Sequence, residues 1–341
     1  MKYEIPAPML AKSVPAIPEG ANLSFEPKWD GFRVLAAFDG TDVELVSRGA
    51  KSLTRYFPEL VAALRRLLPG PCIIDGEIVV PVGGAQRLDW EALSQRIHPA
   101  ASRVEQLAEQ TPASLVAFDL LRLGDHELLA EPFRTRRSEL VSLVARMRPP
   151  IHVTRATSDP ATARRWFAEF EGAGLDGVVA KSLDAPYSPG KRTMMKIKHT
   201  RTADVVAVGY RIHKSGRGLG SLLVGLYDAD GQMRNVGGVS AFSNERRLEL
   251  ITELAPYVER DVAGNPTSGE TERSRFTGSK DVSFVPLRPE RVLEVRYDQL
   301  EGARFRHTVQ FDRWRPDRDP RSCTFSQLEQ VAAYDLRSVL G

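Results

Sequence analysis

The sequence predicts an α+β protein built from two domains, and three observations support this prediction. At 341 residues, the chain is long enough to bury two separate hydrophobic cores. Strand and helix patterns are mixed over the first two hundred residues without strict alternation, which favours antiparallel pairing over a doubly wound parallel sheet. Beyond that point, short strand patterns dominate. We therefore expect a first domain at residues 1–200 and a second, β-rich domain at residues 201–341.

The first domain contains four strand candidates, each short, apolar and rich in β-forming residues. Amphipathic helices are expected between them, because apolar residues recur there at spacings of three and four. These apolar stripes run from Leu53 to Leu68, from Trp90 to Ile97 and from Leu140 to Met147. The strand candidates are Val34–Phe38, Cys72–Val80, Ser114–Leu121 and Gly177–Ser182.

Five strands and one helix are expected in the second domain, with glycine-rich turns between them. This content is typical of a small closed barrel such as an OB-fold. Residues Asp261–Lys280 are polar and rich in turn formers, so we expect a mobile loop there. Ser326–Glu329 has a capping-box pattern, which predicts a C-terminal helix that includes Leu336 and Val339. The expected strands are Val205–Tyr210, Leu222–Tyr227, Arg234–Val239, Arg291–Leu300 and Arg304–Phe311, and the expected helix is Asn244–Tyr257.

Composition excludes several classes of protein. No apolar run is long enough to span a bilayer, and the N-terminus lacks the apolar core of a signal peptide. Cys72 and Cys323 are the only cysteines, and they lack the spacing of a metal site or a disulfide framework. The six histidines are dispersed, so we propose no zinc site. A cytoplasmic protein that does not bind membranes is expected.

Positive charge is concentrated in one stretch of the chain. The formal net charge is only +3, but Lys191–Arg217 holds eight lysines and arginines against a single acidic residue, Asp204. Such a stretch is typical of a surface that contacts nucleic-acid phosphates. An ordinary solvated face is the alternative interpretation.

The segment Lys28-Trp29-Asp30-Gly31 is the first candidate for chemistry. A lysine amine attacks phosphorus only when it is uncharged, and nearby cations such as Lys196 and Lys198 would favour that form. Gly31 permits a tight turn or a close approach of the backbone to a ligand. By itself the tetrapeptide is a weak signal, because a surface turn explains Asp and Gly equally well.

Further charged segments follow Lys28 in a particular order, which makes the signal much more specific. The ordered set resembles the signature motifs of the covalent nucleotidyltransferase superfamily, which comprises DNA ligases, RNA ligases and mRNA capping enzymes. The resemblance extends from Glu26 to Arg318. The segments are Ser47–Gly49, Asp75–Ile78, Ala117–Leu120, Asp176–Lys181, Lys196–Lys198 and Arg315–Arg318.

Within that superfamily, the chain is similar to the minimal bacterial ATP-dependent DNA ligases, of the ligase C type or the ligase domain of ligase D. The supporting stretches are Glu26–Arg33, Arg55–Glu59, Gly216–Gly220 and Phe311–Arg318. The resemblance implies an adenylyltransferase domain (a nucleotidyltransferase fold that is ATP-grasp-like), followed by an OB-fold domain. That layout matches the two domains expected from the strand and helix patterns.

The resemblance also implies roles for the residues that would hold the nucleoside. Lys28 would form a phosphoramide with AMP and release pyrophosphate from ATP. Glu26 would accept a hydrogen bond from the adenine amino group, and Phe118 would stack on the purine. The ribose hydroxyls would be bound by Arg48 and Glu77. The residue expected near the phosphate of the nick is Arg33.

The phosphates and a divalent metal have their own implied residues. Lys196 and Lys198 would neutralise the α-phosphate as its negative charge develops. Asp30 and Asp176 would hold Mg²⁺ or Mn²⁺, directly or through bound water. The second domain is implied to orient the departing pyrophosphate. The residues assigned to this role are Arg315, Asp317 and Arg318.

Two positions depart from the family pattern. The fourth motif usually begins with Glu, but this chain has Asp176, whose shorter side chain reaches less far toward a metal. The last motif commonly ends in Lys, where this chain has Arg318, which offers a planar fork of donors instead of a point charge. Both substitutions retain the required charge, so the interpretation stands.

The resemblance implies a three-step reaction with ATP and not NAD⁺. The amine of Lys28 attacks the α-phosphate of ATP, the 5′-phosphate of a nick attacks the lysine-bound AMP, and the 3′-hydroxyl displaces AMP. NAD⁺-dependent ligases carry an additional segment before the nucleophile and a four-cysteine zinc module. Only 27 residues precede Lys28, and two cysteines cannot build that module.

The expected function is thus sealing of nicked duplex DNA in DNA repair, through break joining or excision repair. We expect a monomer, with a Ku-like end-binding protein or a repair polymerase as candidate partners. An RNA ligase or a capping-type guanylyltransferase would use the same lysine chemistry. Outside the enzymes, the alternative is a non-catalytic OB-type binding protein.

Single residues also have structural alternatives. Phe118 lies in the middle of an apolar strand, where an aromatic side chain is usually part of the core. Asp75 and Glu77 are two residues apart on a strand and therefore share a face, which could be the solvated side of the sheet. The glycines of Gly216–Gly220 superficially suggest a dinucleotide loop. A hairpin turn is favoured, because no helix follows them.

Overall fold

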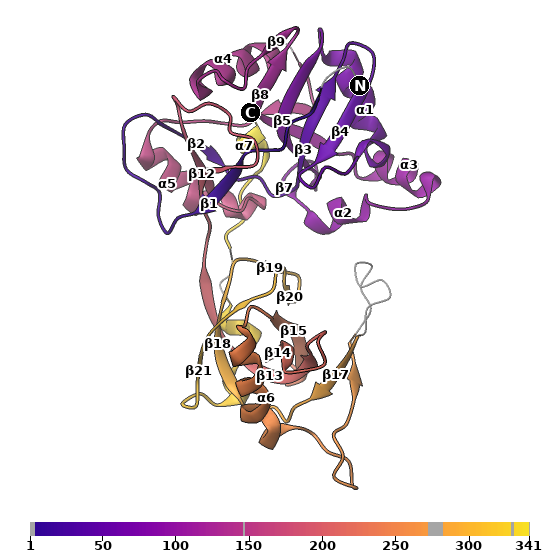
Figure 1. Ribbon diagram of the computed structural model, residues 1–341, viewed down its shortest axis with the longest axis vertical. Helices are drawn as coiled ribbons and strands as arrows, with labels where there is room; N and C mark the ends of the chain where they lie inside the picture. The colour runs from indigo at the N-terminus through magenta and orange to yellow at the C-terminus, as the bar shows by residue number, and fades with distance from the viewer. Residues whose placement is uncertain (1–3, 146, 272–281, 329–330, 341) are drawn as a thin grey trace. The chain divides into compact units, whose positions relative to one another are not determined.

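The computed structural model describes residues 4–145, 147–271, 282–328 and 331–340 (Figure 1). The chain divides into two compact units. One comprises Met1–Lys198 together with Val331–Gly341, and the other comprises His199–Gln330. The division after Lys198 lies two residues before the predicted domain boundary. In the part of the chain that the structure describes, no helix is long and apolar enough to cross a membrane.

The larger sheet of the first unit contains β3 (Phe32–Phe38), β4 (Val43–Ser47), β5 (Cys72–Val79), β8 (Ser114–Leu123), β9 (His126–Glu127) and β10 (Ile151–Val153). Its order is β10-β8-β5-β3-β4, with β9 paired to β8. All of these pairs are antiparallel except β10 with β8. The predominance of antiparallel pairs agrees with the α+β prediction.

The smaller sheet of the first unit contains β1 (Leu10–Ser13), β2 (Leu23–Pro27), β11 (Val178–Ser182) and β12 (Arg192–Ile197). Its order is β1-β12-β11-β2, and only the outer pair of β1 and β12 is parallel. Of these strands, only β11 was predicted. The others are short, with four to six residues each. A further short hairpin consists of β6 (Pro81–Val82) and β7 (Arg87–Leu88).

Within Met1–Lys198, the α-helices of the first unit are α1 (Pro58–Leu67), α2 (Trp90–Gln95), α3 (Ala101–Gln110), α4 (Phe133–Val144) and α5 (Pro160–Glu169). The stripe predicted from Leu53 is divided, because Pro58 occupies the first turn of α1 and a separate 3₁₀ turn, Thr54–Tyr56, precedes it. The stripe predicted from Leu140 to Met147 coincides with the second half of α4 only as far as Val144, where the helix ends. Helices α3 and α5 were not predicted.

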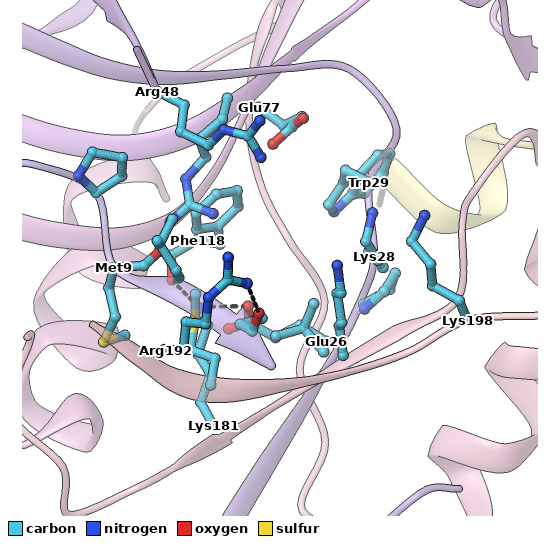
Figure 2. Close-up of a pocket in the computed structure, with 18 of the residues that line it drawn as sticks. Met9, Glu26, Lys28, Trp29, Arg48, Glu77, Phe118, Lys181, Arg192 and Lys198 are labelled. Atoms are coloured by element: carbon cyan, nitrogen blue, oxygen red, sulfur yellow. Dashed lines mark hydrogen bonds and ion pairs between the residues drawn. The ribbon is translucent and has the colours of Figure 1, made fainter. Parts of the chain in front are cut away.

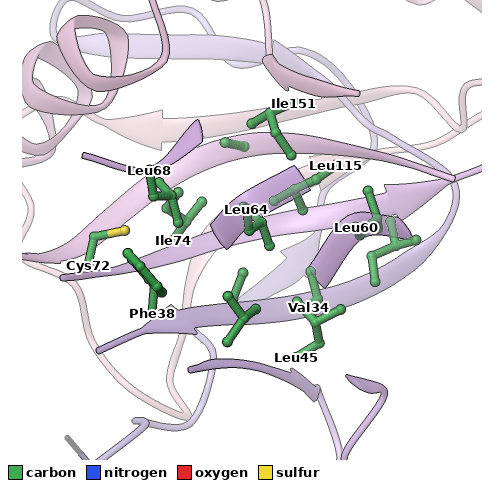
Figure 3. Close-up of a cluster of buried hydrophobic side chains, with 14 of the residues drawn as sticks. Val34, Phe38, Leu45, Leu60, Leu64, Leu68, Cys72, Ile74, Leu115 and Ile151 are labelled. Atoms are coloured by element: carbon green, nitrogen blue, oxygen red, sulfur yellow. The ribbon is translucent and has the colours of Figure 1, made fainter. Parts of the chain in front are cut away.

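The core beneath the larger sheet is formed where α1 packs on its strands. Leu60 and Leu64 of α1 are completely buried against Val34, Ile74 and Leu115 (Figure 3). The sheet is thereby covered on this face by an apolar layer. Its opposite face is left to carry the polar residues of the site.

The second unit is a curled sheet. It contains β13 (Arg201–Ile212), β14 (Leu219–Tyr227), β15 (Met233–Val239), β16 (Gly269–Glu270), β17 (Ser283–Pro286), β18 (Val292–Tyr297) and β21 (Gln310–Trp314). The strands β15, β14, β13, β18 and β21 pair in that order. A bridge between Val239 and Val309 joins the two ends of this series, so the sheet closes on itself as expected for an OB-fold.

Details of the second unit differ from the prediction. The strand expected at Arg304–Phe311 is divided into β20 (Arg304–Phe305), which pairs with β19 (Leu300–Glu301), and β21. The expected helix is α6 (Asn244–Leu254) followed by a 3₁₀ turn. Part of the expected mobile loop forms β16, which pairs with β17, and residues 272–280 of that loop lie outside the described residues. The segment Gly216–Gly220 lies in the β13–β14 hairpin, as favoured.

The C-terminal segment requires a correction, because the prediction assigned residues up to 341 to the second domain. Leu336 and Val339 are completely buried against Trp166 and Phe170 of the first unit. The backbone N–H of Leu336 donates to the carbonyl of Gln86 at 2.8 Å. These apolar contacts place the segment in the first unit.

The predicted terminal helix is also wrong in extent. Ser326 lies in a 3₁₀ turn, Phe325–Gln327, which ends because Leu328 adopts an extended conformation. Leu328 is buried in the core of the second unit. The helix that follows later, α7, covers only Arg337–Leu340. Burial of Leu328 thus prevails over the local capping pattern.

Candidate active site

A cavity of about 670 Å³ lies in the first unit, and its lining comes from both of that unit's sheets (Figure 2). The lining also includes the N-terminal segment from Ala7 to Ala11, which leads into β1. The structure brings most of the predicted first-domain residues together here. Those that line the cavity are Glu26, Lys28, Arg33, Arg48, Glu77, Phe118, Lys196 and Lys198.

Lys28 follows directly after β2, and the backbone fixes its position. Its N–H donates to the carbonyl of Gly177 at 2.8 Å, and its own carbonyl accepts from the N–H of Asp176 at 2.9 Å. Gly177 has a φ of +120°, and a Cβ there would lie 2.0 Å from the carbonyl oxygen of Ile197. Only glycine fits this position, so it allows three segments to meet around Lys28.

The carboxylate of Asp176 lies between two lysines. Its Oδ2 is 2.6 Å from Nζ of Lys28 and 2.7 Å from Nζ of Lys198. Burial lowers the pKa of Lys196, and the neighbouring charges of Lys198 and Lys28 lower it further. The cluster therefore holds more positive than negative charge, which suits a phosphate group.

Gly31 allows β5 to approach the nucleophile segment. A Cβ at Gly31 would lie 2.1 Å from the carbonyl oxygen of Ile78 and 3.0 Å from Cγ of Glu77. No side chain can occupy that space. The glycine that appeared in the sequence as a turn former is thus required for close packing.

Arg33 is held by a buried carboxylate. Its Nε and Nη2 lie 2.5 Å and 2.6 Å from the two oxygens of Asp75, which is completely buried. Burial disfavours the charged guanidinium, but the attraction of Asp75 prevails and raises the pKa of Arg33. The guanidinium carbon lies 4.4 Å from the ring centroid of Phe118. Asp75 is therefore part of the site and not of a solvated face.

Glu77 faces the cavity from the same strand. Burial raises its pKa to about 7, although the charges of Arg33 and Lys28 oppose that rise. Arg48 lines the cavity from the turn after β4 and is exposed. Phe118 is 7% exposed, so it belongs both to the packed interior and to the cavity wall.

The predicted residues of the second unit form a separate cluster around Asp204. Nη1 of Arg315 lies 3.0 Å from Oδ1 of Asp204, and Nε of Arg318 lies 3.5 Å from its Oδ2. Arg315 also pairs with Asp317 at 2.8 Å, and hydrogen bonds from Arg315 lower the pKa of Asp317 to about 2. The cluster is thus an ordered network that presents two arginines.

Comparison with protein families decides the identity of the fold. The family model described as "ATP dependent DNA ligase domain" matches residues 8–198, which is more than half of the chain. The "ATP dependent DNA ligase C terminal region" matches residues 215–318. The chain belongs to the ATP-dependent DNA ligase family.

Known ligases resemble the chain over nearly its whole length. It is 57% identical to DNA ligase C of Mycobacterium tuberculosis, over 98% of this chain and 96% of the relative. It is 55% identical to DNA ligase C1 of Mycolicibacterium smegmatis, with the same coverage. The predicted resemblance to ligase C is confirmed. A solved Lig E DNA ligase, 18% identical, aligns with a TM-score of 0.57 over 92% of this chain and 100% of that one, which supports the fold.

Sequence reasoning assigned no role to several residues of this ligase that line the cavity or support it. Lys181 and Arg192 line the cavity, and Tyr187 supports it by donating to Oδ2 of Asp75 at 2.6 Å. Lys181 carried a signal, because it is a lysine within an otherwise apolar strand. Tyr187 carried none, since its partners are distant in the sequence.

The metal prediction for this ligase concerns Asp30 and Asp176. Among the described residues, no three His, Cys, Asp or Glu side chains gather as a metal site. Two lysines already contact Oδ2 of Asp176. Two carboxylates are too few to surround Mg²⁺, which in such sites takes further oxygens from substrate phosphates and water. Neither Asp30 nor Asp176 is among the residues that line the cavity, so a divalent ion would need further oxygens from a bound triphosphate to be held there.

Proposed function

We propose that this ligase seals 3′-hydroxyl/5′-phosphate nicks in duplex DNA through an AMP carried on Lys28. The observation that carries the proposal is the cluster of Lys28, Lys196 and Lys198 in a cavity that also contains Phe118. A purine stacked on the ring would leave its phosphates facing three lysines. This arrangement suits a nucleotide better than a neutral ligand.

In the first step, the amine of Lys28 attacks the α-phosphorus of ATP. An N–P bond forms, the bond to the β-phosphate oxygen breaks, and pyrophosphate leaves. The amine must lose a proton, and the nearest acceptor is Asp176 at 2.6 Å. Lys196 and Lys198 neutralise the negative charge that develops on the phosphate. Alignment and charge neutralisation therefore provide most of the catalysis.

The nucleoside is bound by groups from both sheets. Glu26 accepts from the adenine amino group and Phe118 stacks on the base. Arg48 and Glu77 hold the ribose hydroxyls. The raised pKa of Glu77, about 7, allows this carboxyl to act as donor or acceptor toward a hydroxyl.

The later steps join the DNA strands. The 5′-phosphate of the nick attacks the phosphorus of the lysine-bound AMP and releases the amine, and the 3′-hydroxyl then displaces AMP. Arg33 is assigned to the phosphate of the nick. In the second unit, Arg315, Asp317 and Arg318 are assigned to the pyrophosphate of the first step.

Mg²⁺ or Mn²⁺ is proposed as the divalent ion, held by triphosphate oxygens with Asp30 and Asp176, where it would supply positive charge to the phosphates. The ligase is proposed to act as a monomer in DNA repair, in break joining or excision repair. A Ku-like end-binding protein and a repair polymerase are the proposed partners. Co-purification with each purified partner at low and moderate salt would test those interactions.

The experiment that tests the proposal locates the nucleotide. The protein is incubated with α-labelled ATP or α-labelled GTP, and the adduct is mapped by peptide mass spectrometry. We expect labelling by ATP at Lys28, sealing of nicked DNA, and loss of both in Lys28→Ala. Lys12→Ala, at an exposed position of β1, serves as the control and retains both. Label on another residue, or sealing by Lys28→Ala, would contradict the proposal.

A further inference from the structure

The cavity contains a buried ion pair between Glu26, which is assigned to the adenine amino group, and Lys181, which has no role in the proposed reaction. Nζ of Lys181, on β11, lies 2.7 Å from Oε2 of Glu26, on the neighbouring strand β2. The two side chains are 4% and 3% exposed. A buried pair of this kind is costly to desolvate, and this cost can exceed the attraction between the two charges. Stability alone is therefore a weak explanation for the presence of this pair.

Lys181 is fixed in place by other contacts. Nζ also donates to the carbonyl oxygen of Phe118 at 3.0 Å, and it lies 4.9 Å and 4.5 Å from the ring centroids of Phe118 and Phe133. The ammonium group therefore contacts both the carboxylate of Glu26 and the aromatic residue Phe118. Glu26 is thereby held by the same ammonium group that contacts the ring of Phe118, on which a base would stack (Figure 2).

The second oxygen of Glu26 lacks a hydrogen bond. Oε1 is buried and has no hydrogen-bond partner among the described residues. The nearest cation on this side is Arg137, whose Nη1 lies 3.9 Å away, beyond hydrogen-bond distance. A buried carboxylate oxygen without a donor is unfavourable, so it calls for an N–H group from a ligand.

The residue that follows Glu26 offers no backbone N–H group to the edge of a base. This residue is Pro27, which has no N–H group. Recognition of the base at this wall therefore falls to side chains. An ionised carboxylate only accepts hydrogen bonds, so it favours a base with an amino group at position 6 and opposes one with a carbonyl there.

We propose that Lys181 is a positioning residue that sets the base specificity of adenylation by keeping Glu26 a pure acceptor. Lys181 occupies Oε2, and Oε1 is left for the 6-amino group of adenine. This inference rests on the proposed function, because it assumes that ATP is the nucleotide bound. It adds that selection against 6-oxopurines depends on a cation that need not touch the base.

The consequence of removing Lys181 follows from elementary electrostatics. A buried carboxylate without its counter-charge escapes the cost of burial by binding a proton. A protonated carboxyl can donate a hydrogen bond, and it then suits the 6-carbonyl of hypoxanthine or guanine. Loss of Lys181 should thus weaken use of ATP and favour use of ITP and GTP, which a merely structural role would not produce.

The experiment compares ATP with ITP and GTP as donors in single-turnover labelling of the full chain. The variants are Lys181→Met, Lys181→Arg and Glu26→Gln, and Lys12→Met is the matched control at an exposed lysine. We expect wild type and control to prefer ATP over ITP by about a hundredfold or more. The preference should fall at least about tenfold in Lys181→Met and in Glu26→Gln, and Lys181→Arg should restore most of it.

The outcomes separate the two proposals. If wild-type protein carries no ATP-derived label on Lys28, the proposed function fails. If wild type is labelled and Lys181→Met loses rate equally with ATP and ITP, the proposed role of Lys181 is overturned. Glu26→Gln keeps the shape of the side chain, so it tests the acceptor role on which the inference depends even if Lys181→Met does not fold. An unchanged preference in Glu26→Gln would also overturn the inference.

Discussion

Arg33 illustrates how single residues of the site are positioned by neighbours that are remote in sequence. The carboxylate of Asp75 accepts hydrogen bonds from two guanidinium nitrogens of Arg33. The hydroxyl of Tyr187 donates to the same carboxylate at 2.6 Å. The hydroxyl of Tyr187 also accepts from the N–H of Met9 at 2.8 Å, which ties the N-terminal wall of the cavity to this network. One carboxylate thus orients a cation, an aromatic ring and a backbone segment.

Glu77 provides a test at the scale of a residue. Its pKa is about 7 in the folded protein, above its ordinary value of 4.5, so the folded state binds this proton more tightly than the unfolded state. The resulting stabilisation is fully present below about pH 4.5 and is lost as the pH rises through about 7. We expect the melting temperature of wild type, relative to that of Glu77→Gln, to fall over this range.

Thermal denaturation at several pH values measures this difference. Glu105→Gln, at an exposed position of α3, is the control, and its melting temperature should follow that of wild type throughout. A difference between wild type and Glu77→Gln that stays constant across the range would show that the carboxyl titrates normally.

At the scale of an element, α1 is anchored at its start and packed along one face. Pro58 begins the helix, and the carboxylate of Glu59 accepts from both terminal nitrogens of Arg96 at 2.6 Å and 2.9 Å. Arg96 is completely buried. The same carboxylate accepts from the N–H of Ala113 at 3.0 Å. These bonds fix the helix against the sheet whose opposite face carries Arg33 and Glu77.

Leu64→Ala tests the packing of this helix. Leu64 is completely buried in the core of the first unit, so the change should cost about 2–5 kcal/mol of stability. Leu248→Ala, on α6 and 56% exposed, should change stability by less than about 0.5 kcal/mol. Chemical denaturation followed by tryptophan fluorescence measures both values. Equal effects of the two variants would mean that α1 is not packed as described.

At the scale of the whole molecule, the two units differ in how their chain is assembled. The second unit is continuous in sequence, whereas the first recruits a terminal segment after the second is complete. This segment passes close to the backbone of the first unit at Gly172. A Cβ at Gly172 would lie 1.9 Å from the carbonyl oxygen of Ala332, so only glycine leaves room for the segment. The first unit is therefore completed only when the segment Val331–Gly341 packs against Met1–Lys198.

Leu336→Ala tests this assembly. Removal of its buried side chain from the cluster with Trp166 and Phe170 should destabilise the first unit by about 2–5 kcal/mol. Val331→Ala, at a position 42% exposed, is the control and should have little effect. Hydrogen exchange of the intact protein reports which unit is weakened. Faster exchange confined to the second unit would contradict the assignment of this segment.

The sequence predicted more about the elements than about their boundaries. Strands rich in apolar residues, such as Cys72–Val80 and Ser114–Leu121, were recognised because extensive burial leaves a local signature even where single charged residues interrupt it. Short strands such as β12 were missed, since two or three apolar residues do not distinguish a strand from a loop. The capping pattern at Ser326 predicted a helix, but a tertiary contact of Leu328 decided otherwise.

The sequence by itself determined the family, the two-domain layout and the order of the charged motifs around Lys28, because these depend on residue type and covalent order. Only the tertiary structure decided which partner each charge has, as in Glu26 with Lys181 or Asp75 with Tyr187. It also decided where the final segment packs. The physical reason is the same in each case, since burial and hydrogen bonding depend on groups that the chain brings together only when it folds.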